Sequence, residues 1–189
     1  MTLDDTVYQE LLGKRPKLCE RSRAHVTNNY CVLQSFGFTD AQILGNTVLL
    51  DHSPSTLKRR YAALCTYVDR AKIPSRGRLL RITSADIRER YNGIRERVPA
   101  RIIRAQPQLL QLPLQTFVDS HAWHVQHDVC YGAGSVLGVS AHRKSEKVNY
   151  VMDLKTLPWD GAIKYFRAKP SYLQKSLSCI ENYVIGTNT

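Results

Sequence analysis

Apolar residues recur along the chain in a helical pattern that restarts about every thirty residues. Within each copy they stand at alternating steps of four and three, which places them on one face of a helix. The copies are Val26, Tyr30 and Leu33; Leu57, Tyr61, Leu64 and Val68; and Ile87, Tyr91, Ile94 and Val98. Strand-like alternation of apolar and polar residues is nearly absent. The pattern therefore predicts an all-α protein.

Superposing the copies gives five columns of equivalent residues: an opening Leu, a helix N-cap four residues later, and three core positions. The members are Leu18, Leu49, Leu79 and Leu109; Ser22, Ser53 and Thr83; Val26, Leu57, Ile87 and Phe117; Tyr30, Tyr61, Tyr91 and His121; and Leu33, Leu64 and Ile94. A unit of two helices cannot bury both of its apolar faces alone, so neighbouring units must stack. The prediction is one superhelical solenoid domain over residues 1–186, with about five to six repeats and a degenerate one near 131–150.

Local signals predict where individual helices begin and end. Gly37 followed by Phe38 is typical of a helix C-terminus closed by a glycine. Thr39 and Gln42 have the spacing of a capping box and open a short helix. Ser53 before a proline predicts an N-cap followed by Pro at the first helical position. Residues 187–189 are expected to form a disordered tail.

The uneven distribution of positive charge indicates that this helical protein has a polyanionic partner. The segment 58–104 holds fourteen basic and four acidic residues, which leaves +10 of the chain's net charge of +11. Twelve of the fourteen are Arg, whose planar guanidinium suits phosphate. The alternative is a solvated basic face that aids solubility. The concentration of charge in one segment favours a polyanion.

The basic residues are expected to flank the core column of each long helix. On an ideal helix starting at Ile87, Arg88 lies roughly 90° to one side of the apolar face and Arg90 roughly 70° to the other. Lys58 and Arg60 are their equivalents one repeat earlier, so two ladders are expected, Lys58/Arg88 and Arg60/Arg90. One of them should face the concave side. The predicted nucleic-acid-binding residues are Lys58, Arg59, Arg60, Arg88, Arg90, Arg95, Arg97, Arg101, Arg104, Arg143 and Lys144.

For the aromatic and metal-ligand candidates, packing within the protein is the competing role. Tyr61 and Tyr91 lie in the core columns and are expected to pack, whereas Trp123 and Trp159 are the better candidates for exposed aromatics. His121, His124, His127 and Cys130 are spaced by three, and each step turns the side chain back by about 60° on a helix. The first and last then point to opposite faces, so we predict a partly buried, hydrogen-bonded helix and no metal site.

Several other classes of protein are not expected. The chain has no Ser-His-Asp arrangement, P-loop or dinucleotide-binding turn, so we predict no catalytic residue, no cofactor and no enzyme activity. It has no run of about eighteen apolar residues, so no membrane interaction is expected. Its start, MTLDDTVYQELL, resembles neither a secretory signal nor a transit peptide. Its five scattered Cys are expected to be thiols.

Proline-leucine elements and one turn complete the pattern. They are Pro16-Lys17-Leu18, Pro107-Gln108-Leu109-Leu110, Pro170-Ser171-Tyr172-Leu173 and Phe36-Gly37-Phe38-Thr39. With the Leu-rich helices, they make nearly the whole chain resemble the mitochondrial transcription termination factor (mTERF) family. Thr47 and Gly77 depart from the motif, because they stand where Pro is expected.

The resemblance implies repeats of two helices plus a shorter third element, and a basic concave face that binds DNA or RNA in mitochondria or chloroplasts. We therefore expect a monomeric mitochondrial protein that binds nucleic acid, with double-stranded DNA favoured over RNA. Its expected role is to regulate transcription or transcription termination. The alternatives are an rRNA-binding ribosome-assembly factor and a helical-repeat scaffold for an acidic protein partner.

Overall fold

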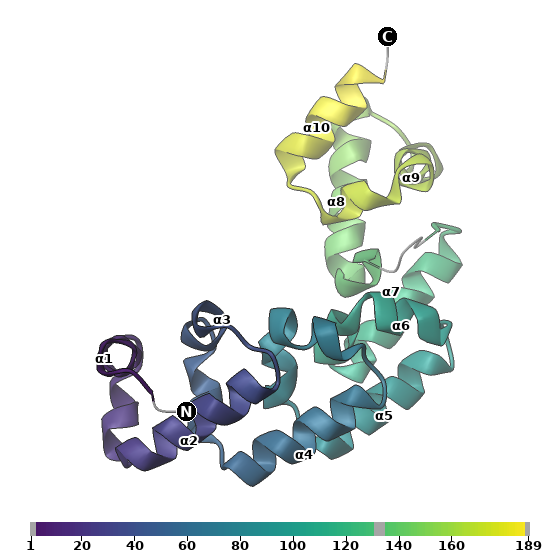
Figure 1. Cartoon of the computed structure of the whole chain (residues 1–189). Helices are drawn as coiled ribbons and strands as arrows, with labels where there is room; N and C mark the ends of the chain where they lie inside the picture. Colours follow the sequence, from purple (N-terminus) through teal and green to yellow (C-terminus); the bar gives the residue numbers. More distant parts are fainter. Residues whose placement is uncertain (1–2, 131–134, 188–189) are drawn as a thin grey trace. The chain divides into compact units, whose positions relative to one another are not determined.

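The computed structural model describes residues 3–130 and 135–187. Within these ranges the chain consists of α-helices and short 3₁₀-helices joined by turns, and it contains no strand (Figure 1). The all-α class predicted from the apolar pattern is therefore confirmed. None of the helices in these ranges combines the length and the apolar character needed to cross a bilayer.

The chain forms two compact units, Met1–Asn92 and Gly93–Thr189, and the boundary falls inside α5 (Ser84–Arg95). An array of repeats can be divided in this way because each repeat contacts only its neighbours. The single domain expected over residues 1–186 therefore stays a prediction, and each unit is described by itself.

The first unit alternates α-helices with 3₁₀-helices. Its other α-helices are α1 (Asp5–Lys14), α2 (Arg23–Ser35), α3 (Asp40–Leu44) and α4 (Pro54–Cys65). Its 3₁₀-helices are η1 (Pro16–Glu20), η2 (Thr47–Asp51), η3 (Arg70–Lys72) and η4 (Pro74–Arg81). One order recurs, a 3₁₀-helix, then a long α-helix, then a short helix. It starts at η1, at η2 and at η4.

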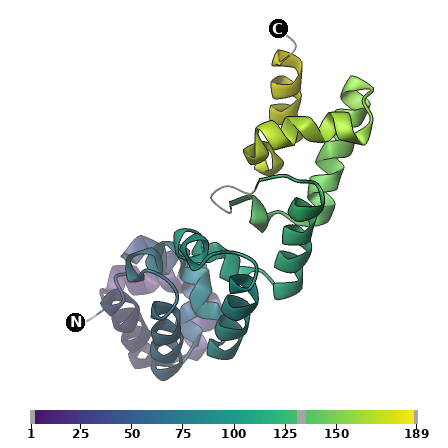
Figure 2. The same ribbon diagram turned by 90° about the vertical axis from the view of Figure 1, so that its right-hand side faces the viewer.

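The second unit continues the alternation of 3₁₀-helices and α-helices, with no short helix described between α7 and η6. Its α-helices are α6 (Ala100–Ala105), α7 (Leu114–Gln126), α8 (Ala141–Lys155), α9 (Trp159–Ala168) and α10 (Leu177–Gly186). Its 3₁₀-helices are η5 (Pro107–Gln111), η6 (Ser135–Gly138) and η7 (Pro170–Gln174). Helix α8 packs against both α9 and α10, and their apolar side chains form one core (Figures 1 and 2).

The opening Leu column and the first and third core columns coincide with buried positions. The opening Leu of each copy is buried, and so are the first core residues Val26, Leu57, Ile87 and Phe117. Tyr61 stacks on Phe36 with ring centroids 3.9 Å apart, and Tyr91 stacks on Tyr67 at 4.2 Å. The expectation that Tyr61 and Tyr91 pack within the protein is therefore confirmed.

The predicted helix boundaries are also confirmed. The hydroxyl of Ser22 accepts a hydrogen bond from the backbone N–H of His25, and Ser53 caps α4 in the same way. Thr39 and Gln42 form the reciprocal capping box that opens α3. Gly37 has φ of +89°, a left-handed conformation that glycine adopts without a steric penalty.

The repeat expected to be degenerate near 131–150 keeps the same element order where it is described. Ser140 caps α8 by accepting a hydrogen bond from the N–H of Arg143, and Val136 and Leu137 are buried at the place of the Leu pair. Residues 131–134 lie outside the described ranges. Of the predicted tail, Thr187 donates to the carbonyl of Val184 (3.0 Å), and residues 188–189 are not described.

Gly77, one of the two departures from the proline motif, is explained by packing in the first unit. A Cβ added at Gly77 would lie 2.9 Å from Cε1 of Phe38 and 3.0 Å from Cγ of Asn46. The Phe38 ring is buried, so it has little room to move. The position therefore disfavours proline, as it disfavours any residue with a Cβ atom.

We expect Gly77→Ala to lower the free energy of unfolding of the first unit by roughly 1–3 kcal/mol, because the added methyl group overpacks the core. Urea denaturation followed by far-UV circular dichroism would measure the loss. Gly13→Ala is the matched control, since no atom lies within 4 Å of its added Cβ. Equal midpoints for Gly77→Ala and the unmodified chain would mean that Phe38 does not pack tightly there.

Candidate nucleic-acid interface

The first unit exposes three predicted cations on two consecutive long helices. Lys58 and Arg59 project from α4 and Arg88 from α5, and all three are exposed. Within residues 3–130 and 135–187, none of them forms an ion pair. Lys58 and Arg88 each follow the buried residue of the first core column by one position, which explains why the ladder Lys58/Arg88 is accessible.

Arg60, from the second predicted ladder, is used inside the protein. Its Nη1 donates to the carbonyl oxygen of Leu80 at 3.0 Å and lies 3.2 Å from Nε2 of His52. Burial and the neighbouring Arg59 lower the pKa of the Arg60 guanidinium. Arg60 therefore links α4 to η4 of the next repeat.

An equivalent hydrogen bond recurs in other repeats, and its donor residue always stands seven residues after the N-cap position. We call this residue the bridging position, because its side chain donates to a carbonyl three residues before the next cap position. The other contacts are Asn29 to Leu50 (2.9 Å), Ser120 to Leu137 (2.9 Å) and Lys147 to Leu173 (2.6 Å). Arg90 holds the bridging position of its own repeat and has an interaction partner.

The hydrogen bond made at the bridging position shows which of the two predicted ladders is available to a ligand. Carbonyls at the end of a short 3₁₀-helix need donors from outside that helix. Arg60 supplies one of these donors, so at least part of its hydrogen-bonding capacity is used within the protein. Lys58 and Arg88 have no such role in the described chain. The ladder Lys58/Arg88 is therefore the one available to a ligand.

One basic residue outside the predicted site lies near His52. This residue, Arg81, is exposed at the end of η4. Burial, followed by the positive charges of Arg60 and Arg81, lowers the pKa of the partly buried His52, while Asp51 raises it. Arg81 belongs to the basic segment, but it lies outside the long helices. Helical periodicity therefore did not assign it to a face of any helix.

The predicted cations that begin the second unit fall into two groups. Arg95 and Arg101 are exposed and form no ion pair with any described residue. Arg97 is half-buried, and its Nη1 contacts Oε2 of Glu96 at 3.1 Å and donates to the carbonyl of Gly93 at 2.8 Å. Arg104 is exposed and has an interaction partner. Arg95 and Arg101 are thus the most available cations of this group.

Lys144 was predicted to contact nucleic acid, and that prediction is wrong. Its side chain is fully buried, and Nζ donates to the carbonyl (3.1 Å) and the hydroxyl (2.6 Å) of Ser120. Nζ also lies 5.4 Å from the centre of the Trp123 ring. Lys144 stands four residues after Ser140, in the first core column where Leu57 and Phe117 stand in earlier repeats. Burial lowers its pKa to about 7.

The prediction that Trp123 is an exposed aromatic is also wrong. Trp123 is buried, and its Nε1 donates to the hydroxyl of Ser145 at 3.0 Å. Trp159 is half-buried, with its ring 5.2 Å from that of His127. Neither Trp therefore offers an open ring for stacking with a base.

The predicted buried His-rich helix is confirmed for His124. This side chain is buried, and its Nδ1 lies 2.8 Å from the carbonyl oxygen of Val129. Burial, followed by the nearby Lys144, lowers the pKa of His124 to about 4, so the ring is neutral at pH 7. Within the described ranges, no three His, Cys, Asp or Glu side chains are placed to share a metal ion, and the five Cys form no disulfide.

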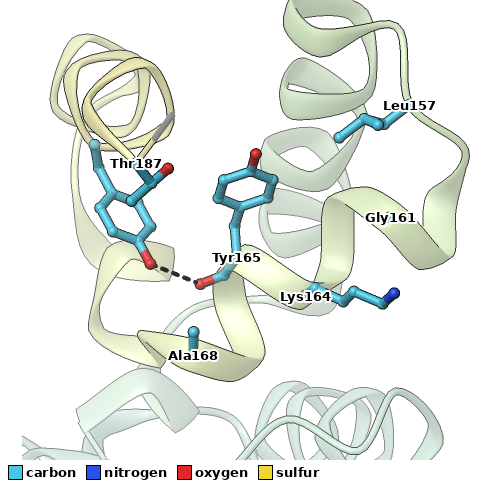
Figure 3. A pocket seen from close by; sticks show the side chains of 7 residues that line it. Leu157, Gly161, Lys164, Tyr165, Ala168 and Thr187 are labelled. Carbon is cyan, nitrogen blue, oxygen red and sulfur yellow. Dashed lines mark hydrogen bonds between the residues drawn. The ribbon is translucent and has the colours of Figure 1, made fainter. Parts of the chain in front are cut away.

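The most apolar of the described pockets offers little to a polyanion. It has a volume of about 500 Å³ and lies between α9 and α10, where Tyr165 and Tyr183 line it (Figure 3). The Tyr183 hydroxyl donates to the Tyr165 carbonyl at 3.4 Å. Lys164 is its one lining cation. The exposed cations, and not this pocket, are therefore the candidate interface.

Comparison of the chain with protein-family models, with curated proteins and with solved structures found no match. Membership of the mTERF family therefore stays a proposal that rests on the motifs.

Proposed function

We propose that this protein is a nucleic-acid-binding helical-repeat protein of the mTERF type, which regulates mitochondrial transcription or its termination. In this proposal the repeats stack as a solenoid. The recurrent order of elements supports the stacking, and so does the bridging position, which joins α2, α4, α7 and α8 to the 3₁₀-helix that begins the next repeat. A repeated contact of this kind sets the same geometry between successive repeats.

The observation that carries the proposal is the uncompensated positive charge of the segment 58–104. Nine of its basic residues are exposed and form no ion pair within the described ranges: Lys58, Arg59, Arg70, Arg76, Arg78, Arg81, Arg88, Arg95 and Arg101. Two of its four acids are already engaged, Glu96 with Arg97 and Asp69 with the N–H of Ala71. Charges of one sign on a folded surface repel each other, and a polyanion relieves that repulsion.

Phosphate contacts account for most of the expected affinity. Exposed Lys and Arg release counterions from the nucleic-acid backbone, so binding should weaken steeply as the salt concentration rises. Such contacts carry little sequence preference by themselves. We favour double-stranded DNA over RNA because of the resemblance to the mTERF family.

A salt series tests the proposal. Affinities for duplex DNA, single-stranded DNA and structured RNA would be measured by fluorescence anisotropy from about 50 to 200 mM salt. We expect duplex DNA to bind most tightly and the logarithm of its affinity to fall linearly with the logarithm of salt concentration. The proposal fails if none of the three ligands binds near physiological salt. A scaffold for an acidic protein would give that result.

The triple substitution of Lys58, Arg59 and Arg88 with Ala should weaken duplex binding at least about 10-fold and flatten the salt slope by about 2–3 units, roughly one per lost phosphate contact. The control removes three other exposed cations, Lys17, Arg21 and Lys164. It changes the net charge equally and should have a much smaller effect. Equal losses in the two variants would reject the ladder Lys58/Arg88 as the binding surface.

A further inference from the structure

A polar pocket of about 410 Å³ lies at the start of α8 in the second unit. Three helices supply its polar side chains: Thr116 comes from α7, Arg143 and Lys147 come from α8, and Gln174 comes from η7. Ser140, the N-cap residue of α8, lines it as well. The pocket thus brings together polar groups from three consecutive repeats.

The lining carries two cations and no acid. Arg143 is exposed and forms no ion pair with any described residue. Lys147 occupies the bridging position, and its Nζ is held at 2.6 Å from the carbonyl oxygen of Leu173 and 2.7 Å from that of Lys175. The nearby acid on the same helix, Glu146, lies outside the pocket lining and 3.3 Å from Nε2 of His142.

No acid among the lining residues balances the positive potential of the pocket. Burial, followed by the positive charge of Arg143, lowers the pKa of Lys147, and Glu146 raises it. The pocket also lies at the N-terminus of a helix of fifteen residues, where the helix dipole adds positive potential. An anion in the pocket would relieve the repulsion between Arg143 and Lys147.

Neutral donors surround the two cations. The Ser140 oxygen accepts a hydrogen bond from the N–H of Arg143 at 3.4 Å, and its own hydroxyl hydrogen can still be donated. Thr116 offers a second hydroxyl and Gln174 an amide. Donors that approach from three helices suit a tetrahedral anion better than a planar carboxylate.

We propose that the pocket formed by Thr116, Ser140, Arg143, Lys147 and Gln174 binds a phosphate group. Arg143 supplies a planar pair of donors and Lys147 a fixed point charge. The volume is that of a small-ligand site, so a nucleotide fits with its phosphate. If the phosphate is a phosphodiester, this inference rests on the proposed nucleic-acid binding. If it is a terminal phosphate or a mononucleotide, the pocket acts independently of that function.

NMR titration of the full ¹⁵N-labelled chain tests this site. The probes are inorganic phosphate and adenosine 5′-monophosphate, with adenosine as the phosphate-free control, all at matched ionic strength. We expect saturable shifts of the amides of Thr116, Arg143 and Gln174 with both phosphates and none with adenosine. Arg143→Ala should weaken phosphate binding at least about 10-fold, since it removes a charged bidentate donor. Lys164→Ala removes an exposed cation of the same unit outside this pocket and should leave binding unchanged.

Two short single-stranded oligonucleotides, one with and one without a 5′-phosphate, identify the source of the phosphate. Shifts of the pocket amides with both oligonucleotides indicate a phosphodiester, and shifts with the phosphorylated one alone indicate a terminal phosphate. The proposal is overturned if no phosphate-bearing probe gives saturable shifts there. It is equally overturned if Arg143→Ala binds phosphate as tightly as the unmodified chain.

The outcomes separate this inference from the proposed function. If the pocket binds inorganic phosphate while duplex DNA, single-stranded DNA and RNA all fail to bind, the proposed function is wrong and the phosphate site stands. If duplex DNA binds and the Lys58, Arg59 and Arg88 variant loses it while the pocket amides do not shift with any probe, the function stands and the phosphate site is rejected.

Discussion

Replacing Lys144 with Met should raise the free energy of unfolding of the second unit by roughly 2–4 kcal/mol near pH 7. A buried ammonium group without a carboxylate partner is costly, and Lys144 has the carbonyl and hydroxyl of Ser120 as its polar contacts. Met has a similar length and no charge. Ser120 keeps a hydrogen-bond acceptor in the Leu137 carbonyl after the substitution, so no buried donor is left unpaired.

The effect has a defined pH dependence. The pKa of Lys144 is about 7 in the folded chain, below the usual 10.5, so between these values the unfolded chain binds a proton that the folded chain does not. Stability should therefore rise with pH from about 7 to about 10.5, by at most about 1.4 kcal/mol per unit. Below pH 7 both states are protonated and this contribution is constant. The gain from Lys144→Met should accordingly shrink as the pH rises.

The two histidines near Lys144 titrate in another range. His124, whose pKa is about 4, and His121, whose pKa burial and Arg97 lower, both favour the neutral ring. Their folded pKa values lie below the usual 6.5, so they reduce stability as the pH falls below 6.5. A comparison between pH 7 and pH 9 therefore isolates Lys144 from the two histidines.

Urea denaturation followed by tryptophan fluorescence would measure this change, because both tryptophans of the chain, Trp123 and Trp159, lie in the second unit. Lys164→Met, at an exposed cation, is the control and should leave stability within about 0.5 kcal/mol. A destabilised Lys144→Met variant would show that the ammonium group stabilises the fold and would contradict the argument.

Replacing Phe117 with Ala should have the opposite effect and lower the free energy of unfolding of the second unit by about 3–5 kcal/mol. Phe117 stands in the same core column as Lys144, one repeat earlier, and its side chain is fully buried. The substitution removes apolar surface and leaves a cavity that its neighbours can fill only in part.

The same fluorescence measurement applies to Phe117→Ala. Phe117→Leu is the matched control, since it keeps most of the apolar volume and should lose much less stability. A loss below about 1 kcal/mol for Phe117→Ala would mean that this column does not form the core of the repeat. Opposite signs for Phe117→Ala and Lys144→Met would establish that one column contains both a normal core residue and a destabilising one.

The apolar period was sufficient to place the core columns and most helix boundaries. Residues such as Leu57 and Ile87 are buried where their spacing predicted, because a helix brings residues three and four apart onto one face. The Ser53 cap was readable for a similar reason, since its acceptor oxygen and the N–H it satisfies lie three residues apart. These features depend on neighbours in the sequence.

The candidate site was predictable only in part. The exposed cations of α4 and α5 follow from composition and helical spacing, and Lys58 and Arg88 lie at the surface as expected. Arg143 was identified as a basic residue, but the pocket around it was not, because Thr116 and Gln174 are brought beside it from helices far away in the sequence.

Local spacing and composition thus account for the helical class, the core columns, the caps and the segment that carries the positive charge. Which cations are available depends on long-range packing. It buried Lys144, committed Arg60 to the Leu80 carbonyl, and filled the space at Gly77 with Phe38 and Asn46. Each of these contacts joins groups at least twenty residues apart in the sequence. Only the packing of successive repeats brings such groups together.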